Sequence, residues 1–209
     1  MDGALRDLRQ QALCRSDGSQ REMRRRIVTT YLGLSIDPGM STGMCVFSFG
    51  DDQPFKQERM WQFNGGAGGL ARALDMLAID ADPGMYIGGE ILDVLVVEKF
   101  TPRGGPGFSL TQASAEPLRG EGVLIGRGFE PYILWAEPSQ QYFMGGTDLA
   151  EKKKRSREFL KLHGLYTTGK AVGQKDADDA ISAELHAIAW LRRKRHMPTL
   201  LELFGPEGK

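Results

Sequence analysis

The sequence predicts a single mixed α/β domain, and three observations lead to this fold class. Short apolar runs over residues 31–36, 44–49 and 58–63 are separated by turn residues, as in antiparallel strands. Helical and apolar segments then alternate along the rest of the chain, as in parallel strands joined by helices. The 209 residues are 41% hydrophobic and 26% charged, which is sufficient for one packed core.

The middle of the chain predicts a helix and then the most apolar strand. Leu70, Ala73, Leu74 and Leu77 recur at the spacing of an amphipathic helix that packs on a sheet. Residues 91–97 form a continuous apolar run, which is typical of a strand covered on both faces. This strand ends in Glu98.

The second half predicts a strand among three helices. A helix over 111–127 contains Pro117, a strand covers 132–135, and helices follow over 148–163 and 175–193. The last of these is apolar nearly all round and is expected to be buried. The domain is therefore assigned to residues 29–196, between a basic N-terminal arm at 1–28 and a C-terminal tail at 197–209.

Charge and cysteine content exclude several classes of protein. The net charge is +0, from 27 basic and 27 acidic residues, which excludes a uniformly basic nucleic-acid binder but allows a segregated one. Residues 151–175 contain eight basic and two acidic side chains, whereas residues 75–98 contain six acidic and no basic ones. The two cysteines have no zinc-site spacing. Because no apolar run approaches the length of a membrane span and no signal-peptide core is present, we expect a cytoplasmic protein without membrane contact.

Four carboxylates stand where secondary-structure elements begin or end. Asp37 follows the first strand and precedes a Pro-Gly turn, and Glu98 closes the most apolar strand. Asp176 and Asp179 are three residues apart in the first turn of the last helix, so they share a face from which Asp178 is excluded. If the strands are neighbours and the helix packs over them, the four carboxylates converge.

Such a cluster needs cations, because close carboxylates repel one another. Oxygen ligands without nitrogen or sulfur suit Mg²⁺ or Mn²⁺, and two such ions can hydrolyse a phosphodiester bond. Each residue also has an ordinary structural interpretation. Asp before Pro-Gly starts turns, Asp at a helix start favours the helix dipole, and a lysine run is usually a solvated face.

Together, in unbroken order from residue 31 to 193, these segments resemble RuvC-type Holliday junction resolvases of the RNase H-like superfamily. Ser35-Ile36-Asp37-Pro38-Gly39-Met40-Ser41-Thr42-Gly43 looks like the first-strand motif of that family, and Val96-Val97-Glu98-Lys99-Phe100 looks like its second acidic strand. Further matches are seen in Arg119-Gly120-Glu121-Gly122, in Glu137-Pro138-Ser139-Gln140-Gln141 and in Asp176-Ala177-Asp178-Asp179-Ala180-Ile181.

The resemblance implies an RNase H-like fold with a central mixed five-stranded sheet flanked by helices on both faces. It implies a homodimer that cuts opposing strands of a four-way DNA junction, with its interface expected along 111–127. The metal-ligand and catalytic positions fall on Asp37, Glu98, Asp176 and Asp179, which would hold two Mg²⁺ ions that Mn²⁺ can replace. DNA contacts are expected from Lys152, Lys153, Lys154, Arg155, Phe100 and Arg103.

Several alternatives remain open. Phe100 or Phe108 is expected to stack on an opened base, and Phe100 is equally well explained as a cap of the core. A nuclease for flaps or RNA–DNA hybrids is the nearest rival, and a branched-DNA binder without activity is a second, although such a binder has no use for a self-repelling cluster. A sugar kinase–actin fold is disfavoured because no second phosphate motif appears. The histidines, among them His186, are expected on helix surfaces or in the tail.

Overall fold

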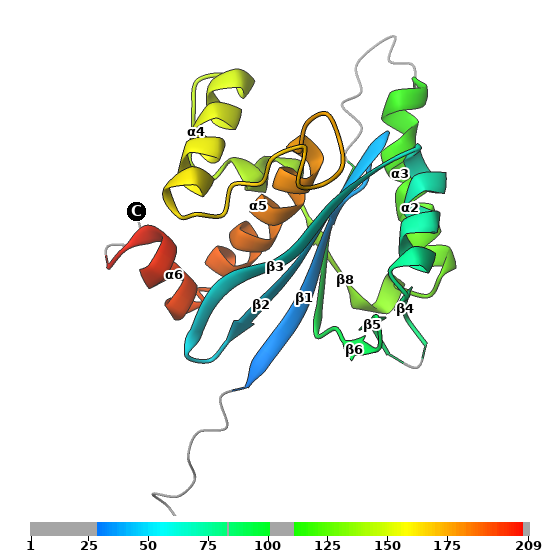
Figure 1. The fold of residues 1–209 in the computed structure, drawn as a ribbon, viewed down its shortest axis with the longest axis horizontal. Coiled ribbons are helices and arrows are strands. Elements are labelled where there is room, and N and C mark those ends of the chain that lie inside the picture. Colours follow the sequence, from blue (N-terminus) through cyan, green and yellow to red (C-terminus); the bar gives the residue numbers. More distant parts are fainter. Residues whose placement is uncertain (1–28, 83, 101–110, 207–209) are drawn as a thin grey trace, which may run out of the picture.

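The computed structural model describes residues 29–82, 84–100 and 111–206, and its strands form a five-stranded sheet in the order β3-β2-β1-β7-β8. Figure 1 shows the elements with the labels used below. The strands of this sheet are β1 (Thr30–Asp37), β2 (Ser41–Gly50), β3 (Gln53–Asn64), β7 (Val94–Glu98) and β8 (Ile133–Ala136). The helices are α2 (Gly66–Met76), α3 (Gln112–Gly126), α4 (Leu149–Leu162), α5 (Asp178–Arg193) and α6 (Met197–Phe204).

The sheet is mixed, as the sequence predicts. Strands β1, β2 and β3 are antiparallel neighbours, whereas β7 runs parallel to β1 and β8 runs parallel to β7. Because parallel strands end at the same edge of a sheet, the last residues of β1 and β7 lie side by side.

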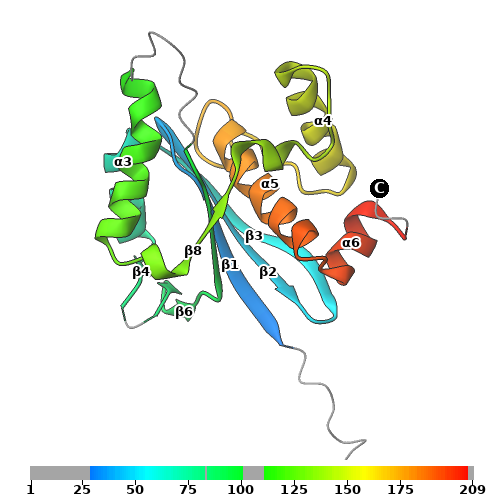
Figure 2. The same cartoon turned by 180° about the vertical axis from the view of Figure 1, so that it is seen from behind.

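Helices cover both faces of the sheet. Helices α4, α5 and α6 lie on one side, and α2 and α3 lie on the other, in both views of the ribbon (Figures 1 and 2). The second side also carries a small three-stranded sheet of β4 (Ile79–Asp80), β5 (Tyr86–Ile87) and β6 (Glu90–Ile91). None of the helices in the described ranges is both long and apolar enough to cross a bilayer.

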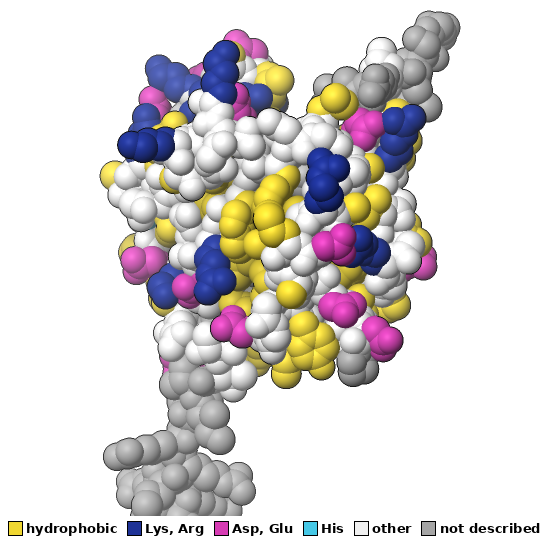
Figure 3. Space-filling view, turned by 45° about the vertical axis from the view of Figure 1, so that its right-hand side comes forward, with side chains coloured by type: hydrophobic (Ala, Val, Ile, Leu, Met, Phe, Trp, Pro, Cys, Tyr) yellow, Lys and Arg dark blue, Asp and Glu magenta, His cyan; other side chains and the backbone are white. Residues whose placement is uncertain are grey.

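The strand period of two divides the core between these layers. In β2, Cys45 and Phe47 belong to the cluster that packs under α5, whereas Met44 and Val46 belong to the cluster on the side of α2. On that second side Trp61 and Phe63 of β3 are only partly buried. Figure 3 shows hydrophobic side chains gathered in the middle of this face, with both basic and acidic side chains around them.

Three segments differ from the sequence-based expectation. The predicted strand at 91–97 divides into β6 and β7, and Asp93 between them accepts from the Leu32 amide at 2.8 Å and donates its own amide to the Leu32 carbonyl at 2.8 Å. Strands β4 to β6 were not anticipated at all. Part of the predicted tail forms α6, where the Thr199 hydroxyl accepts from the Phe55 amide at 2.8 Å. The N-terminal arm lies outside the described residues.

Candidate active site

Asp37 and Glu98 occupy adjacent strand ends. Ile36 of β1 pairs with Val97 of β7, so the next residue of each strand, Asp37 and Glu98, emerges at the same edge. The two carboxyls are close enough to share a hydrogen bond. The prediction that these two residues converge is therefore confirmed.

The third carboxylate comes from α5, which packs tightly over this edge. A Cβ on Gly43 would lie 1.9 Å from the backbone oxygen of Asp179, so only glycine allows the helix to approach β2 this closely. On α5, Asp179, Ser182 and His186 are spaced three and four residues apart and share one face. That face meets the strand ends, because Ser182 and Asp179 both influence Asp37 and His186 contacts Glu98.

Gln62 of β3 holds the start of α5 in place, and sequence analysis did not identify it. Its side-chain oxygen accepts from the amides of Asp179 and Ala180 at 3.1 and 3.2 Å. Its side-chain nitrogen donates to Asp176 Oδ1 at 3.3 Å. Gln62 is buried and therefore acts as the N-terminal cap that the helix lacks in its own sequence. The signal in the sequence that could have identified Gln62 was its place at an inward-facing position of the predicted strand.

The electrostatics of Asp37 and Glu98 are those of a coupled pair. Burial, followed by the negative charges of Glu98 and Asp179, raises the pKa of Asp37 well above its ordinary value, and only Ser182 opposes this. Burial alone would also raise the pKa of Glu98, but hydrogen bonds with His186 and Asp37 outweigh it and lower that pKa. Asp37 therefore holds a proton more readily than Glu98 does.

His186 is a further residue of the site, and its predicted position was wrong. It is fully buried rather than on a helix surface, and its Nε2 lies 3.2 Å from Glu98 Oε2. Within the described ranges its Nδ1 has no hydrogen-bond partner. A histidine surrounded by apolar helix residues gives no signal in sequence that it faces a strand end 88 positions earlier.

Asp179 and Asp176 lie in different surroundings, because α5 begins at Asp178 and Asp176 precedes the helix instead of sharing its first turn as predicted. Burial, together with the charges of Asp176 and Asp178, raises the pKa of Asp179, while the Ser41 hydroxyl and Lys153 oppose the rise. Asp176 is instead held by Gln62, and its Oδ1 also accepts from the Asp178 amide at 3.4 Å. The electrostatic contacts of Asp37 reach Glu98 and Asp179 but do not include Asp176.

The donor set of Asp37, Glu98 and Asp179 fits a hard divalent cation. All three offer carboxylate oxygens, and their mutual repulsion is the kind that bound cations relieve. In the side-chain conformations of this structure, no group of three or more His, Cys, Asp or Glu within the described residues is arranged so that it could hold a metal ion. The three residues therefore match a divalent cation in charge and in ligand atoms, and not through a preformed coordination geometry.

The basic helix α4 lies beside α5 and is joined to it through Asp178. Arg157 hydrogen-bonds to Asp178 Oδ1, and Lys153 Nζ lies 3.8 Å from Asp178 Oδ2. Asp178 thus faces α4 and not the carboxylate cluster, as its helical position predicts. Helix α4 itself begins at Asp148, whose side chain accepts from the Glu151 amide at 2.8 Å.

The predicted DNA-binding cations of α4 do not all face the site. Arg155 pairs with Glu151 at 2.5 Å and Lys154 with Glu158 at 3.9 Å, so both have partners within their own helix. Lys152 packs against Gly146, and Lys153 is the member of the cluster that affects Asp179. Phe100 is partly buried, and its amide donates to Glu121 Oε1 of α3 at 2.7 Å. Arg103 and Phe108 lie outside the described residues.

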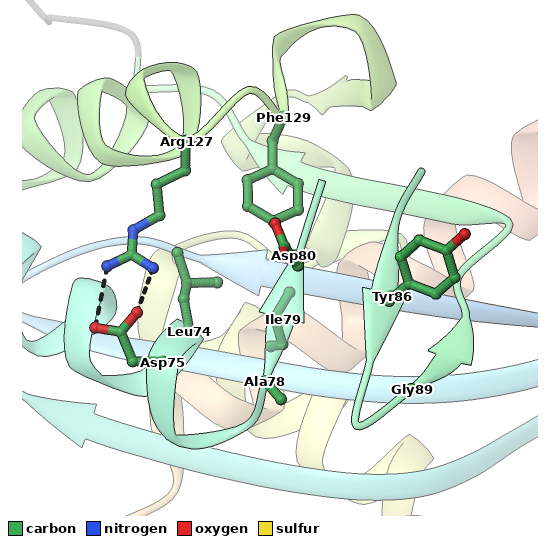
Figure 4. Close-up of a pocket in the computed structure, with 9 residues that line it drawn as sticks. All are labelled: Leu74, Asp75, Ala78, Ile79, Asp80, Tyr86, Gly89, Arg127 and Phe129. Carbon is green, nitrogen blue, oxygen red and sulfur yellow. Dashed lines mark hydrogen bonds and ion pairs between the residues drawn. The ribbon is translucent and has the colours of Figure 1, made fainter. Parts of the chain in front are cut away.

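A hollow of about 650 Å³ lies away from the carboxylates, beyond the last turn of α2. Figure 4 shows its lining, which comes from the end of α2, the small sheet and the end of α3. Arg127 binds the Asp75 carboxylate through two bonds of 2.5 and 3.1 Å and thereby ties α3 to α2. No member of the carboxylate cluster lines this hollow, and we assign it a structural role.

Comparison with solved structures finds Holliday junction resolvases. The yeast mitochondrial Holliday junction resolvase Ydc2 matches with a TM-score of 0.50 and 14% identity, over 90% of this chain and 88% of that chain. Thermus thermophilus RuvC matches alone (TM-score 0.44, 15% identity, 78% and 96% covered) and in complex with Holliday junction substrate (TM-score 0.43, 11% identity, 79% and 97% covered). No protein-family model matches the chain, and no curated protein matches it. The likeness to the yeast resolvase confirms the resolvase-type, RNase H-like fold that the sequence motifs predict.

Proposed function

We propose that this protein is a metal-dependent endonuclease that resolves four-way DNA junctions by hydrolysing phosphodiester bonds. One observation carries the proposal: within a resolvase-type fold, Asp37, Glu98 and Asp179 reach one edge of the sheet from three separate segments and perturb one another there. A structural role alone would not favour partly buried carboxylates that repel each other.

The cofactor in this proposal is a pair of Mg²⁺ ions, for which Mn²⁺ can substitute. Asp37, Glu98 and Asp179 would hold them, with Asp176 as the fourth carboxylate. When bound, such ions activate a water molecule and stabilise the leaving oxygen of the phosphodiester.

The residues of the chain have distinct parts in this proposal. His186 orients Glu98 by its contact with Oε2, and Gln62 fixes the backbone of Asp179 through the helix cap. Lys153 supplies a positive charge beside Asp179, where the phosphate backbone would enter.

Cleavage assays test this function directly. Purified protein is incubated with a labelled four-way junction, a flap, a linear duplex and an RNA–DNA hybrid, in Mg²⁺ and in EDTA. We expect Mg²⁺-dependent cutting of the junction, and its loss in Asp37→Asn and Glu98→Gln with junction binding retained. Cutting of the flap or hybrid instead would support the rival nuclease activities, and binding without any cutting would support an inactive branched-DNA binder.

Paired cuts in opposing strands require two sites related by a two-fold axis, so we also propose a homodimer. Helix α3 offers a surface for it, because Leu118 and Ile125 are 38% and 43% exposed and Gly122 between them has open space beside it. Light scattering at micromolar concentration should give about twice 23.1 kDa. A mass of 23.1 kDa with and without junction DNA would contradict the dimer.

A further inference from the structure

The edge strand β3 presents an aromatic and basic face on the side of the sheet away from α5. Met60 lies in the core under α5 and Gln62 caps that helix, so the alternate residues Arg59, Trp61 and Phe63 project from the opposite face. Trp61 and Phe63 are partly buried and Arg59 is exposed. The patch of hydrophobic side chains in Figure 3 lies on this face.

Two arginines without partners flank the two rings. Arg59 belongs to β3, and Arg72 of α2 folds back over the turn that joins the two elements, with its Nη2 2.9 Å from the position a Cβ on Gly65 would occupy. Neither guanidinium lies within ion-pair or hydrogen-bond distance of an acceptor in the described ranges, and the charge of Arg59 acts only more weakly on Glu58, whose pKa it helps to lower. The acid nearest to Arg59 along the strand, Glu58, is already bound by Lys56 at 2.9 Å and by the Ser48 hydroxyl at 2.6 Å.

The face is continuous with the edge that carries the carboxylates. Phe63 pairs in register with Thr42, in the segment that follows Asp37. Asn64, the last residue of β3, points to the α5 side and donates to the Gln174 side chain at 2.8 Å, so the aromatic side of β3 and the side that carries Asp176 meet at this strand end. In the other direction, Arg59 lines a hollow of about 550 Å³ whose apolar wall includes Leu32 and Val46 and whose charged rim includes Lys56, Glu58 and Glu90.

We propose that Arg59, Trp61, Phe63 and Arg72, here called the aromatic face, bind single-stranded DNA next to the catalytic edge. Aromatic rings stack on bases of any sequence, and unpaired arginines complement phosphates and stack on bases in turn. The two guanidinium groups of the face are positive, which matches the phosphates of a polyanion. The inference rests on the proposed function for its substrate, because the base pairs beside a branch point have lost stacking neighbours and open more easily than those of a linear duplex.

The test measures binding without cutting. Fluorescence anisotropy measures binding of the protein to a labelled oligo(dT) of twelve nucleotides and to a junction with one single-stranded arm. Ca²⁺ replaces Mg²⁺ and every protein carries Asp37→Asn, so that the DNA is not cut. Trp61→Leu keeps an apolar side chain but removes the stacking surface, so the dissociation constant for oligo(dT) should rise at least about fivefold. Arg59→Ala combined with Arg72→Ala should lower the slope of log K against log salt by about 1.4, at about 0.7 per phosphate contact.

Matched controls come from the opposite side of the sheet. Arg192 lies over the rings of Phe143 and Phe204 with centroid distances of 5.9 and 5.0 Å, and this cluster has no contact with the aromatic face. Arg192→Ala and Phe204→Leu should leave oligo(dT) affinity unchanged. Thermal unfolding of each variant verifies that the compared proteins are folded. As a direct readout, an oligonucleotide with 5-iodouracil should crosslink to the peptide that contains Trp61.

Three outcomes overturn or support the inference. Unchanged oligo(dT) affinity in folded Trp61→Leu overturns it. The inference is also overturned if light scattering gives Trp61→Leu half the mass of the wild-type protein while its DNA affinity is unchanged. The aromatic face would then be an interface between two copies of the chain. If Trp61→Leu weakens oligo(dT) binding while the wild-type protein cuts no branched DNA, the inference is supported and the proposed nuclease function fails separately.

Discussion

Gln62 should determine both the stability of the fold and the placement of two carboxylates, and Gln62→Met isolates this role. Methionine has a similar length but neither accepts from the Asp179 and Ala180 amides nor donates to Asp176. Loss of a helix cap costs about 1 kcal/mol, and a second amide left buried without an acceptor costs about 1 kcal/mol more. A total of about 2 kcal/mol corresponds to a fall in Tm of about 4–8 °C for a chain of this size.

The assay compares Gln62→Met with Gln53→Met at the exposed start of the same strand. The Gln53 side chain only accepts from the Thr30 hydroxyl at 3.2 Å, so this control carries the same chemical change without the cap. Circular dichroism gives Tm, and junction cleavage is measured at 25 °C, where both variants are folded. We expect cleavage to fall in Gln62→Met alone. A Tm within 1 °C of the control would refute the capping role, and unimpaired cleavage would refute the positioning role.

Three further predictions concern charges. Asp178→Asn should retain far more junction cleavage than Asp179→Asn. It should also tighten junction binding at low salt, because Asp178 neutralises cations of α4. Equal loss of cleavage in the two variants would refute the assignment of Asp178 to α4 and of Asp179 to the carboxylate cluster. Lys153→Ala should reduce the salt slope of junction binding by about 0.9, because the charge of Lys153 lies beside Asp179, and Lys154→Ala should reduce it less, because Lys154 points to Glu158 of its own helix. Burial raises the pKa of Glu184 well above its ordinary value. The folded state therefore keeps a proton that the unfolded chain releases, and the free energy of unfolding falls as pH rises above about 4.3. In unfolding scans, the Tm advantage of Glu184→Gln over the wild type should therefore grow from pH 5 to pH 8; a constant difference would contradict the buried neutral form.

The convergence of Asp37 and Glu98 was predictable because strand topology constrains it. An acid that ends an apolar strand must emerge at the sheet edge, and parallel β1 and β7 place Asp37 and Glu98 at the same edge. The period of 3.6 residues in a helix also predicted correctly that Asp179 faces the strand ends and that Asp178 does not. These features follow from local sequence patterns of period two and 3.6, which a single sequence contains.

The supporting contacts were not predictable, since they join residues distant in sequence through side chains with several possible roles. Gln62 meets α5 across 117 positions, and a lone glutamine in a strand is equally consistent with solvent exposure. His186 lies among apolar helix residues and was expected on the surface. Strands β4 to β6 have two residues each, which is too short for any periodicity to show.

The three acids around the start of α5 show how one short motif can serve two surfaces. Asp178 and Asp179 are successive helix positions that differ by about 100°, so they meet different partners. Asp179 turns to the strand ends and Asp178 binds Arg157 of α4, whereas Asp176 precedes the helix and is held by Gln62 of β3. The same short segment therefore contributes to the carboxylate cluster and anchors the basic helix beside it. A phosphate that draws the cations of α4 away from Asp178 would leave its charge uncompensated next to Asp179, which strengthens the demand for a cation at the cluster when DNA is bound.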